Sequence, residues 1–411
     1  MFRCITDLKG LAIDVDSIQA ELRDWLWFFE RYQYVFITSE EGTAESLRKI
    51  YGNNYVYQME HYLKLFSPNK IMHGNVLQRL ELMTTEIAYV TGNKEFSDNA
   101  MAFLCGTIWI TTDRITYEAA SVAPDLICQS IEVLKSRLEK HVYGFYGEIN
   151  FPANDNVKGY ILPVILEADE DFLYLFMLGR YFSYSHYMSQ IHPYSSAIYL
   201  NKRGKACGVL DEQFIKLYAA AVNRIKKSRG VDMICAVPVR PDNPNRFKRI
   251  LQSIANQCDI TDISDNFLCN EDYPAQKNLS ELERQENVKG VFYYKGSLYG
   301  KNIVLIDDIV TTGATIKECV RVLKACGADN IFIIVLGVNQ KQGSYWSSKT
   351  AQVNCPVCGE RMLLFVNSNS GQFFYSCPLC GKTMGYEGGR NLLCSFVNSE
   401  FNVNGEDRDR I

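Results

Sequence analysis

The chain has 411 residues, of which 47% are apolar and 22% are charged. These fractions are close to globular averages and exclude a disordered or collagenous protein, and the length predicts two to three domains. With 43 basic and 47 acidic residues the net charge is −4, which excludes a strongly basic nucleic-acid-binding surface over the whole protein. No apolar run approaches the roughly 20 residues that span a bilayer, and the N-terminus lacks a signal-peptide core. We therefore expect a soluble, cytoplasmic protein with no membrane partner.

Residues 1–140 alternate short β-rich runs with helical patterns. Strands are predicted at 34–38, 86–91 and 107–111, and helices at 43–50 and 125–140. This alternation is typical of a parallel sheet that is covered by helices on both faces. We expect one α/β domain over this part of the chain.

A segment near the N-terminus, residues 4–14, has the pattern of a strand followed by a carboxylate, Asp7, and a glycine turn. It resembles the first motif of the haloacid dehalogenase (HAD) superfamily, in which the first aspartate is the nucleophile and the second is the general acid. The resemblance implies a HAD-like domain in which Asp7 takes the nucleophile position, Thr38 binds the transferred phosphate and Lys70 is the third-motif lysine. A shifted frame that uses Asp14 and Asp16 as the two aspartates stays open.

In the Asp7 frame, most of the carboxylates that a HAD phosphatase needs for magnesium are missing. Lys9 occupies the position of the general acid, and Gly92 and Asn93 occupy the position of the fourth-motif acids, with Asp98 as the nearest acid. An aspartate attacks a dianionic phosphate only where a metal ion and a proton donor offset the charge. We therefore expect a catalytically degraded HAD-like domain with a scaffolding or ligand-sensing role and no phosphatase turnover.

Residues 141–345 are predicted to form a second domain. Apolar and aromatic runs predict strands at 160–166, 172–181, 231–238, 301–306 and 330–337, and helical patterns occur at 211–228, 249–257 and 315–326. Buried apolar strands in alternation with helices indicate a Rossmann-like parallel sheet. The predicted fold class is thus α/β, with two Rossmann-like parallel-sheet domains and a small C-terminal module.

The sharpest functional signal is the segment KNIVLIDDIVTTGA at residues 301–314. A buried strand brings two adjacent carboxylates to its carboxyl edge, and a threonine-rich loop then leads into the N-terminus of a helix. The loop amides and the helix N-terminus form a cradle for a phosphate, which the glycine allows to approach closely. Two adjacent carboxylates need a cation or a polyhydroxyl partner, and a ribose diol near magnesium meets that need. The candidate ligand contacts are Asp307, Asp308, Thr311, Thr312, Gly313, Ala314 and Thr315.

This segment resembles the phosphoribosyl-diphosphate (PRPP) motif of type I phosphoribosyltransferases. Residues 236–240, 276–279 and 284–292 extend the resemblance to the ComF-like members over about residues 230–340. The resemblance implies that the acidic pair binds the ribose 2′ and 3′ hydroxyls and that the loop holds the 5′-phosphate. It departs at 245–249, where Asn-Arg-Phe-Lys-Arg replaces a glycine-containing run. Two linked phosphates need several cations, and the candidates on the pyrophosphate side are Arg240, Arg246, Lys248 and Arg249.

Four cysteines near the C-terminus form two Cys-Pro-x-Cys-Gly pairs, at Cys355 and Cys358 and at Cys377 and Cys380. This spacing is typical of a structural zinc site with four thiolate ligands. Residues 362–366 and 372–376 can form the β-hairpin of a zinc ribbon. We expect such a ribbon over residues 351–392, and through it a nucleic acid or protein partner is possible.

The functional prediction is an enzyme with two metal cofactors, structural Zn²⁺ and the Mg²⁺ that accompanies PRPP. It would transfer the phosphoribosyl group of PRPP to an unidentified nitrogen acceptor, a base or an amine, and release pyrophosphate. The alternative is a non-catalytic regulator that senses PRPP or a nucleotide, or a nucleic-acid-processing adaptor.

Overall fold

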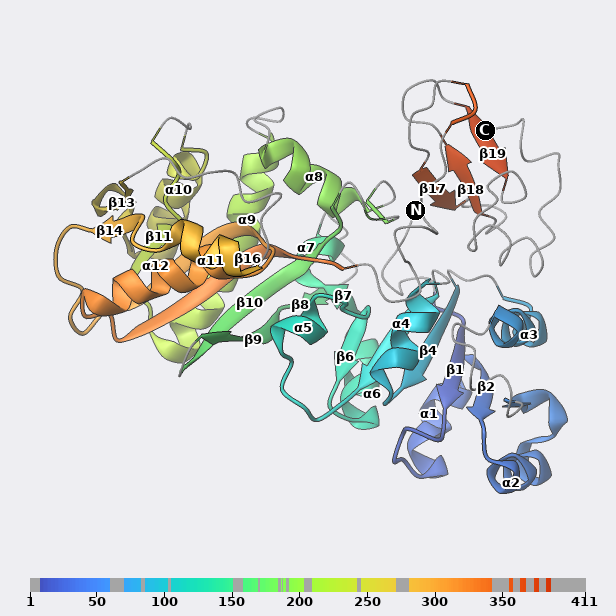
Figure 1. Cartoon of the computed structure of the whole chain (residues 1–411). Helices are drawn as coiled ribbons and strands as arrows, with labels where there is room; N and C mark the ends of the chain where they lie inside the picture. Colours follow the sequence, from blue (N-terminus) through green and yellow to red (C-terminus); the bar gives the residue numbers. More distant parts are fainter. Residues whose placement is uncertain are drawn as a thin grey trace.

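The computed structural model describes residues 8–59, 70–82, 86–102, 105–150, 158–168, 171–183, 186, 188–189, 192–202, 209–241, 245–270, 281–341, 355–357, 363–366, 373–376 and 382–385. Two six-stranded sheets dominate the described part (Figure 1). One lies in residues 1–140, called the first block below, and the other in residues 141–345, called the second block. A three-stranded sheet lies near the C-terminus. In these residues no helix combines the length and the apolar character that crossing a membrane requires.

The first sheet has the order β3-β2-β1-β4-β5-β6, and its strand pairs are all parallel. Every residue of β1 and β4 is buried, as expected for central strands that helices cover on both faces. The strands are β1 (Gly10–Asp14), β2 (Gln33–Thr38), β3 (Val56–Gln58), β4 (Ile87–Thr91), β5 (Gly106–Ile110) and β6 (Leu126–Cys128).

Helices cover both faces of this sheet because successive strand residues point to opposite sides. Leu11 and Ile13 of β1 share a core with α1, α2 and α6, whereas Ala12 lies in a second core with α3 and α4. The helices are α1 (Leu26–Phe29), α2 (Glu41–Tyr51), α3 (Lys70–Leu80), α4 (Lys94–Ala102), α5 (Tyr117–Ala120) and α6 (Ile131–Glu139), with 3₁₀ turns at Leu22–Trp25 and Asn53–Tyr55.

The second sheet has the order β12-β11-β15-β16-β10-β9, and its pairs are parallel except for the antiparallel β9–β10 hairpin. The strands are β9 (Leu162–Ala168), β10 (Asp171–Tyr181), β11 (Met233–Ala236), β12 (Thr261–Asp262), β15 (Asn302–Val310) and β16 (Asn330–Asn339).

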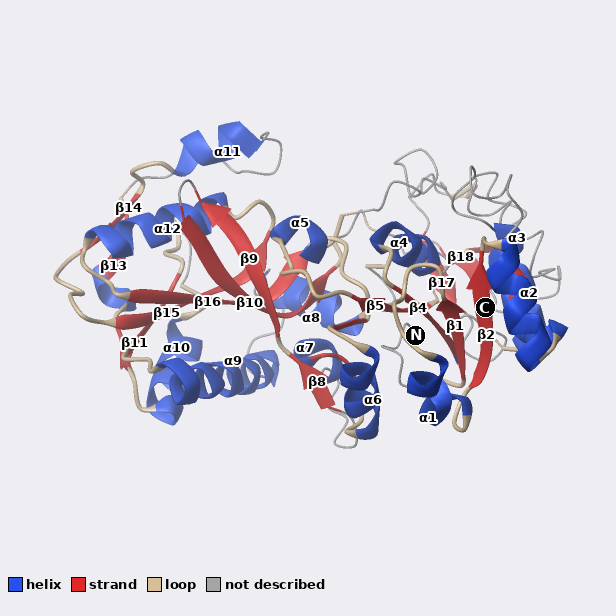
Figure 2. Cartoon of the chain, turned by 90° about the horizontal axis from the view of Figure 1, so that it is seen from below, coloured by secondary structure: helices blue, strands red, loops and turns tan. Residues whose placement is uncertain are grey.

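Figure 2 shows the helices on the two sides of this sheet, α9 and α10 on one and α11 and α12 on the other. The helices are α8 (Pro193–Lys202), α9 (Val209–Arg229), α10 (Lys248–Cys258), α11 (Glu281–Val288) and α12 (Ala314–Ala325). The short elements are β7 (Val142–Phe145), α7 (Tyr146–Ile149), β8 (Lys158–Tyr160), a 3₁₀ turn at Ser264–Asn266, β13 (Phe267–Cys269) and β14 (Phe292–Tyr294).

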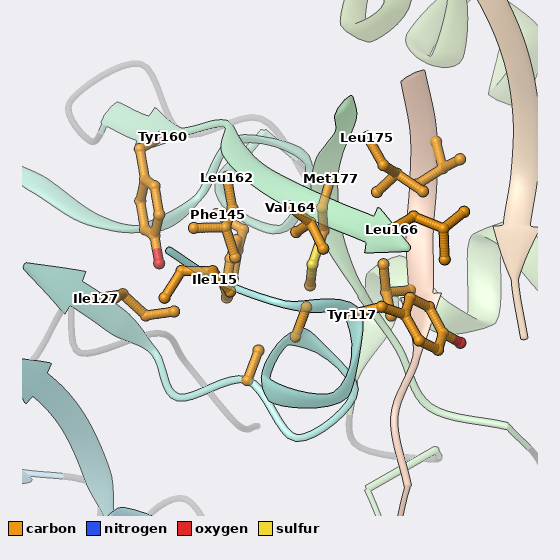
Figure 3. Packing of buried hydrophobic residues seen from close by; sticks show 14 of the residues in the cluster. Ile115, Tyr117, Ile127, Phe145, Tyr160, Leu162, Val164, Leu166, Leu175 and Met177 are labelled. Carbon is orange, nitrogen blue, oxygen red and sulfur yellow. The ribbon is translucent and has the colours of Figure 1, made fainter. Parts of the chain in front are cut away.

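The two blocks share one hydrophobic core. Ile115 and Ile127 of the first block lie in the same buried cluster as Leu162 and Val164 of β9 and Phe145 of β7 (Figure 3). Separating the blocks would expose these side chains to water, and the free-energy cost is roughly 25 cal/mol for each Å² of apolar surface exposed. The blocks are therefore packed together through a continuous apolar contact.

A buried charge cluster adds to this contact. Arg180 of β10 is fully buried, and its guanidinium bonds Glu148 of α7 at 2.8 and 2.9 Å and Asp125 of the first block at 2.9 Å. Burial raises the pKa of Asp125 against the opposing effect of Arg180. Burial also opposes ionisation of Glu148, but Arg180 and His192 outweigh it and hold the pKa of Glu148 below its usual range. Arg180 and His192 therefore favour the ionised form of Glu148.

Most elements in the described ranges lie where the sequence predicts them, with two corrections. Gly10, expected in a turn, instead begins β1, and a Cβ there would lie 2.3 Å from Leu82 Cδ1. Asp7 lies outside the described residues. The helix expected at 125–140 is β6 followed by α6, because the Ser130 side chain accepts from Val133 N and starts the helix at Ile131.

The predicted C-terminal hairpin is confirmed. β17 (Leu363–Val366) and β18 (Phe373–Ser376) pair in antiparallel register, and β19 (Thr383–Gly385) adds to β18. Cys355 is buried, whereas Cys358, Cys377 and Cys380 lie outside the described residues. The predicted zinc ligation is thus not visible as a set.

Candidate functional site

The turn between β15 and α12 has the geometry of an anion-binding loop. Gly313 adopts φ +80°, a left-handed conformation that favours glycine, and a Cβ there would lie 2.9 Å from a methyl carbon of Leu166. The main-chain amides of Thr312, Gly313 and Ala314 donate to no acceptor within the described part of the chain. They precede or begin a twelve-residue helix, whose N-terminus carries a partial positive charge. The loop therefore offers several amide donors to one anion.

The predicted threonines surround these amides to different degrees. Thr311 is exposed, Thr312 and Thr315 are half-buried, and Ala314 is buried at the start of α12. Hydroxyl groups at these positions can add donors to the amide cradle. The structure thus brings the whole predicted loop set together at one end of β15.

The acidic pair lies inside β15, which continues two residues past it to Val310. Asp308 is buried, and Asp307 Oδ1 accepts a hydrogen bond from the Asp308 amide at 2.8 Å. Burial and the neighbouring Asp308 raise the pKa of Asp307 to about 7, although Arg246 and Lys202 oppose the shift. Asp307 therefore changes charge near neutral pH, while Asp308 carries the ion pairs.

Two cations lie against Asp308. Arg246 Nη2 is 2.5 Å from Asp308 Oδ2, and Lys202 Nζ is 3.8 Å from Asp308 Oδ1. Lys202, the last residue of α8, was not predicted, because no local pattern connects it with a strand more than a hundred residues later. A cation near a helix C-terminus is common for electrostatic reasons alone, so it carries no functional signal in the sequence.

The four cations expected on the pyrophosphate side are not all gathered at the acidic pair. Arg246 reaches Asp308, whereas Arg249 pairs with Glu212 of α9 at 2.6 Å and Lys248 is exposed on α10. Arg240 follows β11, which runs parallel to β15 with Ala236 opposite Ile306. The carboxyl ends of parallel strands meet at one edge, so Arg240 belongs to the same edge as the acidic pair.

The first sheet has its own polar edge. Asp14 ends β1, and its Oδ2 accepts from Ser17 Oγ at 2.5 Å and from Thr91 Oγ1 at 2.6 Å. Asp16 accepts from Thr38 Oγ1 at the end of β2 and from Ser39 N at 2.7 Å. The two aspartates of the shifted frame, Asp14 and Asp16, therefore both lie at this edge, whereas Asp7 lies outside the described residues.

Other expected members of this edge are engaged elsewhere. Lys9, the residue before β1, forms an ion pair with Glu86. Lys94 pairs with Asp98, the acid nearest to the fourth motif. Lys70 begins α3. Among the residues that the structure describes, no three His, Cys, Asp or Glu side chains are grouped as metal ligands would be.

The comparisons with known proteins concern mainly the second block. Residues 247–356 match the family model described as phosphoribosyl transferase domain. A search of curated proteins found no match to the chain. The match covers less than half of the chain.

Several solved structures are similar to the chain. A purine phosphoribosyltransferase from Pyrococcus horikoshii Ot3 shares 15% identity over 31% of this chain and 84% of its own, with a TM-score of 0.23. A hypoxanthine phosphoribosyltransferase from Staphylococcus aureus shares 15% over 33% and 67%, also with a TM-score of 0.23. UMP synthase from Leishmania donovani shares 11% over 82% and 72%, with a TM-score of 0.20. Similarity at this level does not determine a substrate.

The raised pKa of Asp307 predicts a pH-dependent effect of its substitution. Because the folded pKa of about 7 lies above the ordinary value of 3.8, folding stability is lost as the pH rises through this window and is constant above it. The Asp307→Asn variant has no carboxyl group to ionise, so it does not lose stability as the pH rises. At pH 8 the free energy of unfolding of the variant should exceed that of the parent protein by about 2–4 kcal/mol, with almost no difference at pH 4. Urea unfolding at both pH values measures it.

Asp308→Asn should also reduce the parent's loss of stability between pH 4 and pH 8, because it removes the neighbouring charge that raises the pKa of Asp307. If Asp307→Asn has the same effect at pH 4 and pH 8, the pKa of Asp307 is not raised.

Proposed function

We propose that the chain is a PRPP-dependent phosphoribosyltransferase that transfers the phosphoribosyl group to a nitrogen acceptor. The observation that carries the proposal is the position of the acidic pair, with Asp308 buried, two residues before a loop in which the amides of Thr312, Gly313 and Ala314 donate to no acceptor in the described residues. One end of this arrangement suits a diol and the other suits a phosphate monoester, the two groups that a ribose 5-phosphate carries. The family match to residues 247–356 supports the same activity.

In the proposed reaction the residues of this chain hold the sugar and the leaving group. The loop amides bind the 5′-phosphate, and the acidic pair accepts the ribose hydroxyls. An ionised carboxylate has about four acceptor sites, so Asp308 can accept a hydroxyl while it keeps Arg246 and the Ile309 amide. Mg²⁺ bound with PRPP would supply positive charge to the diphosphate.

Arg246 has the position to serve both sides of the ligand. It is half-buried and flanks Asp308, and its planar guanidinium can bond a carboxylate and a phosphate at once. Arg240, at the same edge, is the second candidate for the diphosphate. Charge built up on the leaving group as the C1–O bond breaks would then be stabilised by fixed cations.

Loss of both carboxylates should abolish the sugar contacts. Asp307→Asn with Asp308→Asn is expected to weaken PRPP–Mg binding at pH 8 by at least about tenfold, since hydrogen bonds to ionised groups contribute about 1.5–3 kcal/mol each. Calorimetric titration of the full chain measures it, and Arg249→Gln is the matched control because its pairing with Glu212 keeps it from the acidic pair. Unchanged PRPP affinity in the double variant contradicts the site.

Pyrophosphate release separates the enzyme from the alternative function. With PRPP, Mg²⁺ and a panel of bases and amines, a transferase releases pyrophosphate in the presence of its acceptor. A regulator or adaptor that senses PRPP binds it through the same residues and releases none.

We propose that the first block is HAD-like and does not turn over phosphate monoesters. The Asp14–Asp16 pair and Thr38 at one edge of a parallel sheet support the resemblance. Hydroxyl and amide donors already satisfy both carboxylates, and burial raises the pKa of Asp14. A nucleophile whose charge is disfavoured and a fourth motif that lacks carboxylates both argue against phosphoryl transfer.

This proposal predicts no hydrolysis above background. The full chain should release no phosphate from a panel of phosphate monoesters with Mg²⁺ between pH 5 and pH 8, and Asp14→Asn should not change that rate. Phosphate release measures it. Turnover that disappears in Asp14→Asn would show an intact second active site.

We propose that Cys355, Cys358, Cys377 and Cys380 bind one structural Zn²⁺ and that the module is a zinc ribbon. The antiparallel β17–β18 hairpin between the two cysteine pairs supports this assignment. Metal analysis of protein purified under reducing conditions tests it: about one zinc per chain is expected, and none after Cys377→Ser.

A further inference from the structure

Residues 115–117 of the first block lie against the edge of the second sheet. Ile165 of β9 donates its amide to the Ile115 carbonyl at 2.8 Å, and Thr116 forms a parallel bridge with Ile165. β9 is the last strand of the second sheet. A short piece of the first block thus continues the pairing of the sheet that holds the acidic pair.

Residues 120–123, just after this segment, are hydrogen-bonded to the two residues that follow β16. The buried side chain of Gln340 donates to the Ala120 carbonyl at 3.0 Å and accepts from the Ala123 amide at 2.8 Å. The Lys341 amide donates to the Ser121 carbonyl at 2.7 Å. The helix α5 is therefore held at both of its ends by the second block.

Tyr117 begins α5 and contacts the loop between β15 and α12 at Thr311. Its side chain is 6% exposed and lies beside Leu166 of β9 (Figure 3), the residue that also faces Gly313. The Tyr117 hydroxyl donates a hydrogen bond to the main-chain carbonyl of Thr311. A residue of the first block thus contacts the backbone of the loop that would bind the 5′-phosphate.

The hydrogen bond from Tyr117 to the Thr311 carbonyl also orients the amide of Thr312. The peptide between Thr311 and Thr312 is planar, and in a trans peptide the C=O and the following N–H point in opposite directions. When Tyr117 holds the Thr311 carbonyl, the Thr312 amide is turned away from Tyr117, and it donates to no acceptor in the described residues. The hydrogen bond therefore determines where one ligand-binding amide points.

We propose that Tyr117 is a positioning residue of the phosphoribosyl site and that the first block thereby completes this site. The inference rests on the proposed function, since it concerns the same loop. A loop amide that is oriented before the ligand arrives costs less to order on binding, so the bond should favour ligands with a 5′-phosphate. Ligands that carry only the diphosphate do not use this amide.

The test is Tyr117→Phe, which removes one oxygen and keeps the ring. Tyr160→Phe is the matched control: Tyr160 is equally buried in the same core, and its hydroxyl has no hydrogen-bond partner within the described residues (Figure 3). Calorimetric titrations of both full-chain variants use PRPP–Mg, ribose 5-phosphate and inorganic pyrophosphate, and the thermal unfolding midpoint is measured in parallel.

For Tyr117→Phe we expect binding of PRPP–Mg and of ribose 5-phosphate to weaken about three- to tenfold, the range for one hydrogen bond. Pyrophosphate affinity should not change, and in turnover assays KM for PRPP should rise while kcat stays the same. Tyr160→Phe should match the parent protein in every titration. Such selective loss supports positioning, because a general loss of structure weakens all three ligands.

Two outcomes would refute the inference and leave the proposed function intact. If the parent protein binds PRPP and Tyr117→Phe binds ribose 5-phosphate equally well, Tyr117 does not position the loop. If Tyr117→Phe loses pyrophosphate and ribose 5-phosphate to the same extent and unfolds at a lower temperature, its role is structural. A parent protein that binds no PRPP refutes the proposed function, and the inference is refuted with it.

Discussion

The buried guanidinium of Arg180 is the constraint on which the joint between the two blocks depends. It lies in β10 of the second sheet and bonds a carboxylate from each side, Asp125 of the first block and Glu148 of α7. A buried guanidinium is costly unless its donors are paired, and separation of the blocks would take the Asp125 carboxylate away from Arg180 while Glu148 stays. The relative position of the blocks is therefore held by the Arg180–Asp125 hydrogen bond as well as by the shared apolar core.

A fixed joint has a consequence for the site in the second block. The segment that follows Tyr117 also carries Ala123, whose carbonyl accepts from Arg180 Nη1 at 3.3 Å. The charge cluster, the Gln340 bonds and the Tyr117 hydroxyl therefore act on one stretch of about ten residues, from the edge of β9 to the start of β6. Tight packing transmits small displacements instead of absorbing them. Arg180 and the loop at Thr311 thus contact the same short stretch of the first block.

The sequence predicts those parts of the site that are contiguous in the chain. The acidic pair and the threonine-rich loop could be found because strand, turn and helix occupy adjacent positions from Asn302 to Ala325, and each has a local signal. Lys202, Arg180 and Tyr117 have no such signal. Tyr117 lies 194 positions from Thr311, and its buried aromatic ring has the same pattern in the sequence as any core residue. Contacts of this kind depend on the tertiary fold.

The N-terminal block shows how a single glycine fits two interpretations in the sequence. The pattern predicts a turn at Gly10, whereas Gly10 begins β1, where a Cβ would lie 2.3 Å from Leu82 Cδ1. With β1 at Gly10–Asp14, the carboxylates of Asp14 and Asp16 reach the sheet edge, and hydroxyl and amide donors from neighbouring loops satisfy them. Donors that saturate a carboxylate also stiffen the loops that carry them. The hydrogen bonds of Asp14 and Asp16 thus stabilise the edge of the first sheet. A rigid first block suits the proposed role of Tyr117, which is to position the loop at Thr311.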